Sequence, residues 1–83
     1  MAMKKSKTMR INLPIIVEKD EDGFYVVECP ILKGCYTQGK TLDEALTNIH
    51  EVIEMCLEEE SEDTVSDIAN IQEFSFHTIA VEV

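Results

Sequence analysis

Apolar and polar residues alternate over residues 10–19. The apolar side chains fall at every second position, which predicts a strand with one buried face. Pro14 has no backbone N–H to donate, so this strand is expected at the edge of a sheet or at a bulge. The residues on the predicted buried face are Ile11, Leu13, Ile15 and Val17.

Two shorter strands are predicted next, over residues 24–29 and 35–38. The turn at residues 20–23 ends in Asp22-Gly23, a pair that tolerates the positive φ of a tight hairpin. Pro30 ends the second strand, and a short loop leads to the third. The three strands should form an antiparallel meander, with Ile16, Tyr25 and Val27 as candidates for its uncovered face.

The clearest element is a helix over residues 41–59. Thr41 and Glu44 fit a capping box at its start. Apolar residues then recur at spacings of three and four, so one stripe of the helix should lie on the sheet. The stripe comprises Leu42, Ala45, Leu46, Ile49, Val52, Ile53, Cys56 and Leu57.

The C-terminal part is predicted as a turn or short helix over residues 64–72, then a fourth strand over 73–83 with a bulge near His77. The order β-β-β-α-β indicates an α+β fold, an antiparallel meander with one amphipathic helix packed on one sheet face. Residues 10–83 form one domain after a basic, flexible leader at 1–9. Such a small one-sided core favours a homo-oligomer, a dimer or a tetramer.

The charge distribution points to a basic protein partner. Seventeen acidic residues stand against seven Lys and Arg, for a net charge of −10, and residues 41–83 contain no Lys or Arg. Such a surface repels phosphate backbones and anionic membranes and complements a basic protein. The candidate partner-binding residues are Glu51, Glu54, Glu58, Glu59, Glu60, Glu62 and Asp63.

The compartment is expected to be the cytoplasm. The first ten residues lack the apolar stretch of a signal peptide, and no apolar run approaches the length of a membrane span. Three cysteines are few and odd in number, as expected of a reduced protein. Cys29 and Cys35 form a loose pair that favours packing over zinc binding, and Cys56 falls on the apolar stripe.

No enzyme signature stands out, so neither catalysis nor a cofactor is expected. His50 and His77 have no nucleophile or ligand pattern around them, and no glycine-rich phosphate loop is present. Two alternatives stay open. One is a metal-dependent hydrolase using Asp20, Asp22 and Asp43, and the other is an oligomeric structural module without a partner.

Three ordered motifs resemble the HicB-like (UPF0150-like) antitoxin family. They are Asp22-Gly23-Phe24 running to Pro30, then Leu32-Lys33-Gly34-Cys35, then Gly39-Lys40-Thr41 running to Ala45. The resemblance implies a partial ribonuclease H-like fold. It also implies an antitoxin that binds HicA, a small basic RNA-cleaving toxin, and covers its catalytic histidine. Many relatives carry a C-terminal DNA-binding segment. This chain ends at Val83, directly after the predicted fourth strand, so no direct binding to nucleic acid is expected.

Overall fold

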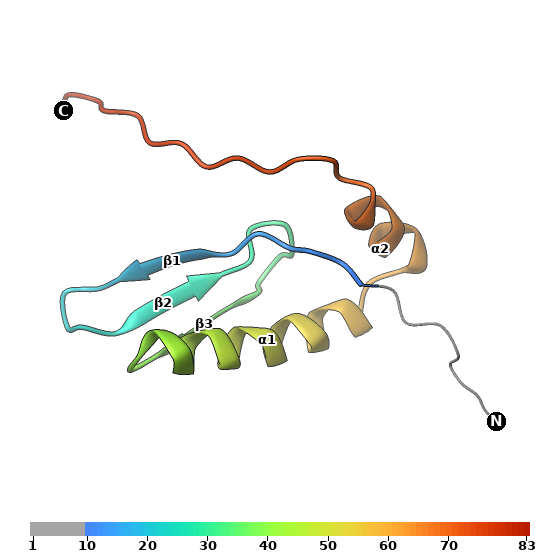
Figure 1. Cartoon of the computed structure of the whole chain (residues 1–83), viewed down its shortest axis with the longest axis horizontal. Coiled ribbons are helices and arrows are strands. Elements are labelled where there is room, and N and C mark those ends of the chain that lie inside the picture. The colour runs from blue at the N-terminus through green and yellow to red at the C-terminus, as the bar shows by residue number, and fades with distance from the viewer. Residues whose placement is uncertain (1–9) are drawn as a thin grey trace.

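The computed structural model describes residues 10–83, and these form an α+β fold (Figure 1). Three antiparallel strands in the order β1-β2-β3 make one sheet, and two helices follow. The predicted leader at residues 1–9 lies outside the described residues. The elements are β1 (Ile16–Lys19), β2 (Tyr25–Glu28), β3 (Tyr36–Gly39), α1 (Leu42–Glu58) and α2 (Glu62–Ala69).

The turn between β1 and β2 is built around Asp20. The Asp20 Oδ1 atom accepts hydrogen bonds from the backbone N–H groups of Asp22 (3.0 Å) and Phe24 (2.9 Å), and the Asp20 carbonyl accepts one from the N–H of Gly23. Gly23 adopts φ 89°, a conformation that residues with a Cβ rarely adopt. The predicted hairpin turn is confirmed.

The pairing register decides which strand residues face α1. Val17 lies opposite Val27, and Val27 is fully buried. Because side chains alternate between faces, Tyr25 lies on the same side of β2 as Val27. The expectation that Tyr25 and Val27 occupy the uncovered face was therefore wrong. That face instead carries Ile16, Glu18, Val26, Glu28, Tyr36 and Gln38.

Helix α1 begins where it was predicted, with one variation in its cap. The Thr41 hydroxyl accepts from the Glu44 N–H (3.1 Å) as in a capping box. The Glu44 carboxylate, however, accepts from the N–H of Lys40, one residue before the cap (2.6 Å). Both bonds satisfy donors that the helix itself cannot satisfy.

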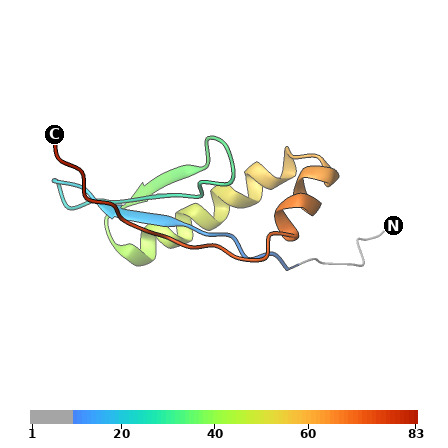
Figure 2. The same cartoon turned by 90° about the horizontal axis from the view of Figure 1, so that it is seen from above.

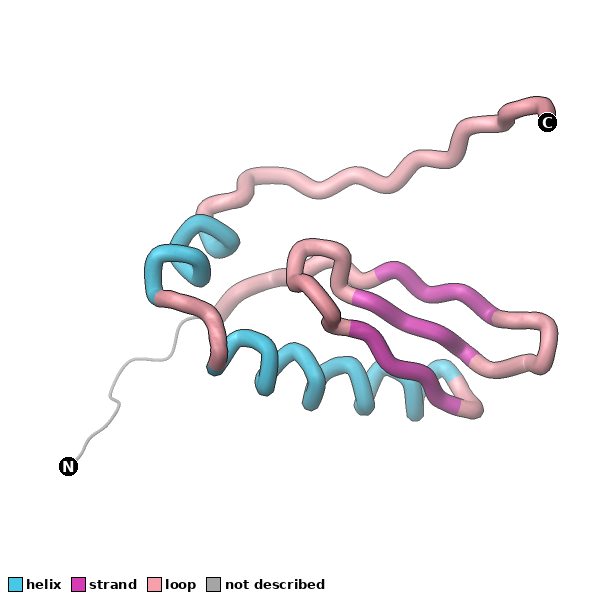
Figure 3. Tube along the Cα trace, turned by 180° about the vertical axis from the view of Figure 1, so that it is seen from behind, coloured by secondary structure: helices cyan, strands magenta, loops and turns pink. Residues whose placement is uncertain are grey.

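The sheet and α1 approach most closely at Gly39, which is buried. A Cβ at this position would lie 2.5 Å from the backbone nitrogen of Ala45 and 2.9 Å from its Cα. Helix α1 therefore lies over β3 and β2, and the outer strand β1 is left partly uncovered (Figure 3). The buried core consists of Val27, Cys29, Leu32, Cys35, Ala45, Ile49 and Ile68.

The C-terminal segment departs from the prediction. Residues 62–69 form α2, which contributes Ile68 to the core, and residues 73–83 form no strand. They extend alongside the sheet without a ladder to it (Figures 1 and 2). The predicted fourth strand was therefore wrong for this single chain. Alternating apolar residues suit an extended backbone, but a strand also needs a paired edge.

Replacing Gly39 with alanine should destabilise the fold by about 2–3 kcal/mol, because the new methyl group would press on helix backbone that cannot move aside. Urea unfolding followed by circular dichroism measures the loss. Gly34→Ala is the matched control, since Gly34 has φ 72° but no atom within 4 Å of the added Cβ. It should cost only about 1 kcal/mol of backbone strain. A Gly39→Ala loss no larger than that of the control would contradict the close approach.

Candidate functional site: an acidic surface beside an apolar groove

All seven candidate partner-binding residues are exposed, and we call them the acidic surface. Glu51, Glu54 and Glu58 lie three or four residues apart on α1, so they share one side of the helix. Glu59 and Glu60 follow between α1 and α2, and Glu62 and Asp63 begin α2.

The acidic surface includes residues at the C-terminus of α1 and at the N-terminus of α2, and these two helix ends have opposite electrostatic character. Glu58 closes α1, where the helix dipole disfavours negative charge, and α1 has no basic residue in its last turn. Glu62 and Asp63 occupy the first turn of α2, where the dipole favours them, behind the N-cap Ser61. These two acids stabilise α2 locally, which the sequence pattern did not indicate.

Little positive charge offsets the acidic surface. Over residues 10–83 the one ion pair is that of His50 Nδ1 with Glu54 Oε1, at 3.7 Å, and both side chains are mostly exposed. Lys19 lies over the ring of Tyr25, 5.4 Å from its centroid, on the far hairpin. The carboxylates therefore keep their long-range attraction for a basic surface.

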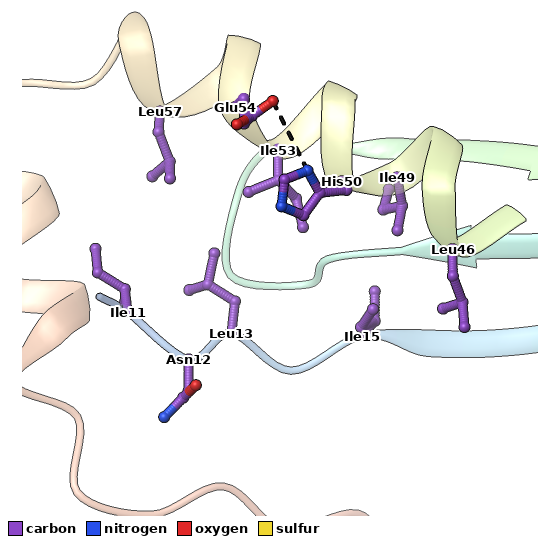
Figure 4. A pocket seen from close by; sticks show the side chains of 10 residues that line it. All are labelled: Ile11, Asn12, Leu13, Ile15, Leu46, Ile49, His50, Ile53, Glu54 and Leu57. Atoms are coloured by element: carbon purple, nitrogen blue, oxygen red, sulfur yellow. Dashed lines mark ion pairs between the residues drawn. The ribbon is translucent and has the colours of Figure 1, made fainter. Parts of the chain in front are cut away.

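An apolar groove of about 420 Å³ runs between α1 and the segment that leads into β1 (Figure 4). Leu13 and Ile15 point toward the helix, whereas Asn12 points away from it. The strand predicted over residues 10–19 is shorter in the structure, because β1 begins only at Ile16. Ile11, Leu13 and Ile15 still line the helix-facing side, but α1 covers the predicted buried face only in part, and Ile15 and Val17 are 37% and 41% exposed. The apolar groove is lined by Ile11, Leu13, Ile15, Leu46, Ile49, Ile53 and Leu57.

The apolar groove and the acidic surface adjoin. His50 and Glu54 line the groove from the helix side, and Glu51 lies beside Leu46 on the same helix. The sequence pattern identified the acids but not the groove. It showed an apolar face on the first strand and one on α1, but it did not show that α1 covers the face of the first strand only in part. The arrangement suits a partner that presents basic side chains around apolar ones.

The three aspartates of the hydrolase alternative are not gathered at one site. Within residues 10–83, no three His, Cys, Asp or Glu side chains come together as a metal site would need. Asp20 holds the hairpin turn, and Asp43 lies in the first turn of α1. Their positions have sufficient structural explanations, and the geometry gives the hydrolase alternative no support.

The cysteines lie together in the core as free thiols. Cys29 and Cys35 are buried, and the Cys29 N–H donates to the Cys35 carbonyl (2.9 Å) across the loop. Burial, with a smaller contribution from the hydrogen bond with Cys56, raises the pKa of the Cys35 thiol to about 12. A thiol held protonated in this way is a poor nucleophile and metal ligand. The expected packing role of Cys29 and Cys35 is confirmed, whereas Cys56 is only half-buried.

Comparison with known proteins identifies the family. The sequence model described as the HicB_like antitoxin of bacterial toxin-antitoxin systems matches residues 13–78. The chain belongs to the HicB-like antitoxin family. The match includes all five helices and strands and the first part of the segment after α2.

Several relatives of this HicB-like chain carry UPF0150 names. UPF0150 protein ssr1258 of Synechocystis is 52% identical over 58 residues, which are 70% of this chain and 84% of the relative. UPF0150 proteins of Archaeoglobus fulgidus and Thermoplasma acidophilum are 57% and 59% identical over 44 residues, 53% of this chain and 64% of each relative.

Neither helix within residues 10–83 of this HicB-like chain has both the length and the apolar character needed to cross a membrane.

Salt should stabilise this protein. Raising the ionic strength from about 0.01 M to about 1 M shortens the Debye length from about 30 Å to about 3 Å, which screens the repulsion among uncompensated carboxylates. Thermal unfolding followed by circular dichroism should show a midpoint that rises by several degrees. A midpoint that falls with NaCl would indicate that attractive ion pairs dominate the surface instead.

Stability should also decline above about pH 9 because of Cys35. The unfolded chain releases this thiol proton near its ordinary pKa of 9.0, whereas the native thiol keeps it until about pH 12. The unfolded state therefore binds fewer protons over this range, so the free energy of unfolding falls as pH rises.

Denaturant unfolding at several pH values, with Cys35→Ala as the comparison, isolates this contribution from those of Lys and Tyr. The variant should lose less stability between pH 8 and pH 10 than the parent. Parallel pH profiles for the two proteins would contradict the assignment.

Proposed function

We propose that this protein is an antitoxin that neutralises a small, basic, RNA-cleaving HicA-like toxin by direct contact. Membership of the HicB-like antitoxin family carries the proposal, because an antitoxin requires a toxin. Inhibition of this kind is stoichiometric and needs neither catalysis nor a cofactor from the antitoxin itself.

The charges of the described residues support the choice of a basic partner. The acidic surface is exposed and almost without counter-charges, so it would speed and orient the approach of a positively charged protein. Exposed ion pairs contribute little individually, about 0.2–1 kcal/mol each. Most of the binding energy would therefore come from apolar contact beside the acids, for which the exposed Met55 of α1 is available.

The same features define the setting in which the protein would act. We infer a cytoplasmic homo-oligomer, a dimer or a tetramer, since a core of seven buried residues leaves much apolar surface exposed. A net charge of −10 would oppose direct contact with nucleic acid. The toxin, not the antitoxin, would then be the component that meets RNA.

The proposal predicts a salt-sensitive complex with a basic protein encoded beside this one. The triple variant Glu51→Gln, Glu54→Gln, Glu58→Gln removes three charges from the acidic surface and should weaken binding by about tenfold. Isothermal titration of the two separately purified proteins at about 0.1 M and about 1 M salt measures both effects. The parent should lose more affinity at high salt than the variant does.

A matched control separates local contact from net charge. Glu18→Gln, Glu21→Gln, Glu28→Gln also changes the net charge from −10 to −7, but on the β1–β2 hairpin. Its affinity should stay close to that of the parent. Equal losses in the two triple variants would contradict a binding role for the acidic surface. Absence of any complex would leave the oligomeric structural module as the better description.

A further inference from the structure

Residues 73–83, which we call the tail, expose apolar side chains in a strand-like pattern. Ile79 and Val81 are 84% and 75% exposed, and Phe76 is 72% exposed. In an extended backbone the residues at 79, 81 and 83 point to one side, so they form an apolar stripe. Stripes of this kind are normally buried, because each exposed aliphatic side chain forgoes its transfer free energy.

The sheet offers an edge that suits this stripe. Strand β1 pairs only with β2, so the backbone groups along its outer side have no partner strand in the described chain. The helix-facing side of that edge is also uncovered, with Val17 41% and Ile15 37% exposed. A strand added beside β1 would place alternate side chains over Val17 and the apolar groove.

We propose that the tail of one copy pairs with the β1 edge of a second copy, and that the tail of the second copy pairs with the β1 edge of the first. Ile79, Val81 and Val83 would then cover Val17 and the apolar groove of the partner. The inference rests on the oligomeric state proposed above and does not depend on toxin binding.

Chain direction favours a second copy over the chain's own edge. The tail runs in the same direction as β1, yet it forms no ladder with it (Figures 1 and 3). Pairing within one chain would therefore be parallel. A second copy can present its edge in the antiparallel direction, which is slightly more stable per residue.

Charge and size also favour a second copy. The tail carries only Glu73 and Glu82 as acids, so it lacks the negative charge that would attract a basic toxin and limit self-association. At about 3.3 Å per residue, the tail spans roughly 36 Å and residues 11–19 roughly 30 Å. Together they supply about 20 residues per copy, the number that a stable interface uses.

Sedimentation equilibrium of the full chain tests the inference. The parent should be a dimer, and Ile79→Asn with Val81→Asn should weaken association by roughly 100-fold or more, since two apolar side chains are lost from each of two exchanged strands. Val17→Asn changes the receiving edge and should weaken association while the tail stays intact. Thr78→Asn with Ala80→Asn is the matched control, because these exposed residues lie on the opposite side of the extended tail from the apolar stripe and the change should leave the dimer intact.

Thermal unfolding of the variants at low concentration should match that of the parent, which shows that the fold survives. A parent that stays monomeric up to about 1 mM would overturn both the interface and the oligomeric state. A dimer that resists the Ile79 and Val81 substitutions would overturn the interface alone. It would leave both the oligomer and the antitoxin proposal standing.

Discussion

The backbone contact between Gly39 and the first turn of α1 determines how the rest of the molecule is arranged. With no side chain between them, the end of β3 meets Ala45 directly, and α1 is held over β3 and β2. One helix is too narrow to cover three strands, so β1 keeps half-exposed apolar residues. The open edge, the apolar groove and the position of the tail all follow from this offset.

Because α1 lies over β3 and β2 and not over β1, the protein has an apolar surface and a separate acidic surface. The apolar groove and the tail provide area for burial, which is the main source of binding energy. The acidic surface provides long-range attraction and orientation, and its contribution depends on salt. In the proposals made above, recognition of a basic toxin and association with a second copy use different surfaces.

The sequence predicted the local elements well because their signals are local. Asp22-Gly23 predicted the first turn, Thr41 and Glu44 predicted the start of α1, and both assignments hold in the structure. The role of Asp20 in the turn emerged only from the structure. The fourth strand failed for a different reason. Its alternation is real and the tail lies alongside the sheet, but it forms no ladder with β1, and periodicity alone does not encode pairing. The face assignment of Val27 failed because a shift of one residue reverses a strand's faces.

The acidic part of the candidate site was visible in the sequence, whereas its surroundings were not. A charge run such as Glu58 to Asp63 can be counted directly, but its division between two helix ends depends on Ser61 starting a second helix. The apolar groove depends on how far α1 lies from β1, and no periodicity encodes that distance. The family match adds the functional assignment that neither charge nor geometry supplies alone.

In this account, α1 covers β2 and β3 but leaves β1 and the tail uncovered. Hydrogen exchange of the full chain, at a concentration low enough to keep it monomeric, tests this arrangement most directly. Amides of β2, β3 and the middle of α1, around Val27 and Ile49, should exchange slowest, since they belong to the buried core. Amides at Ile79 and Val81 should exchange at nearly unprotected rates. Protection of those two amides equal to that of Val27 in the monomer would contradict the account, because the tail would then be a fourth strand of its own sheet.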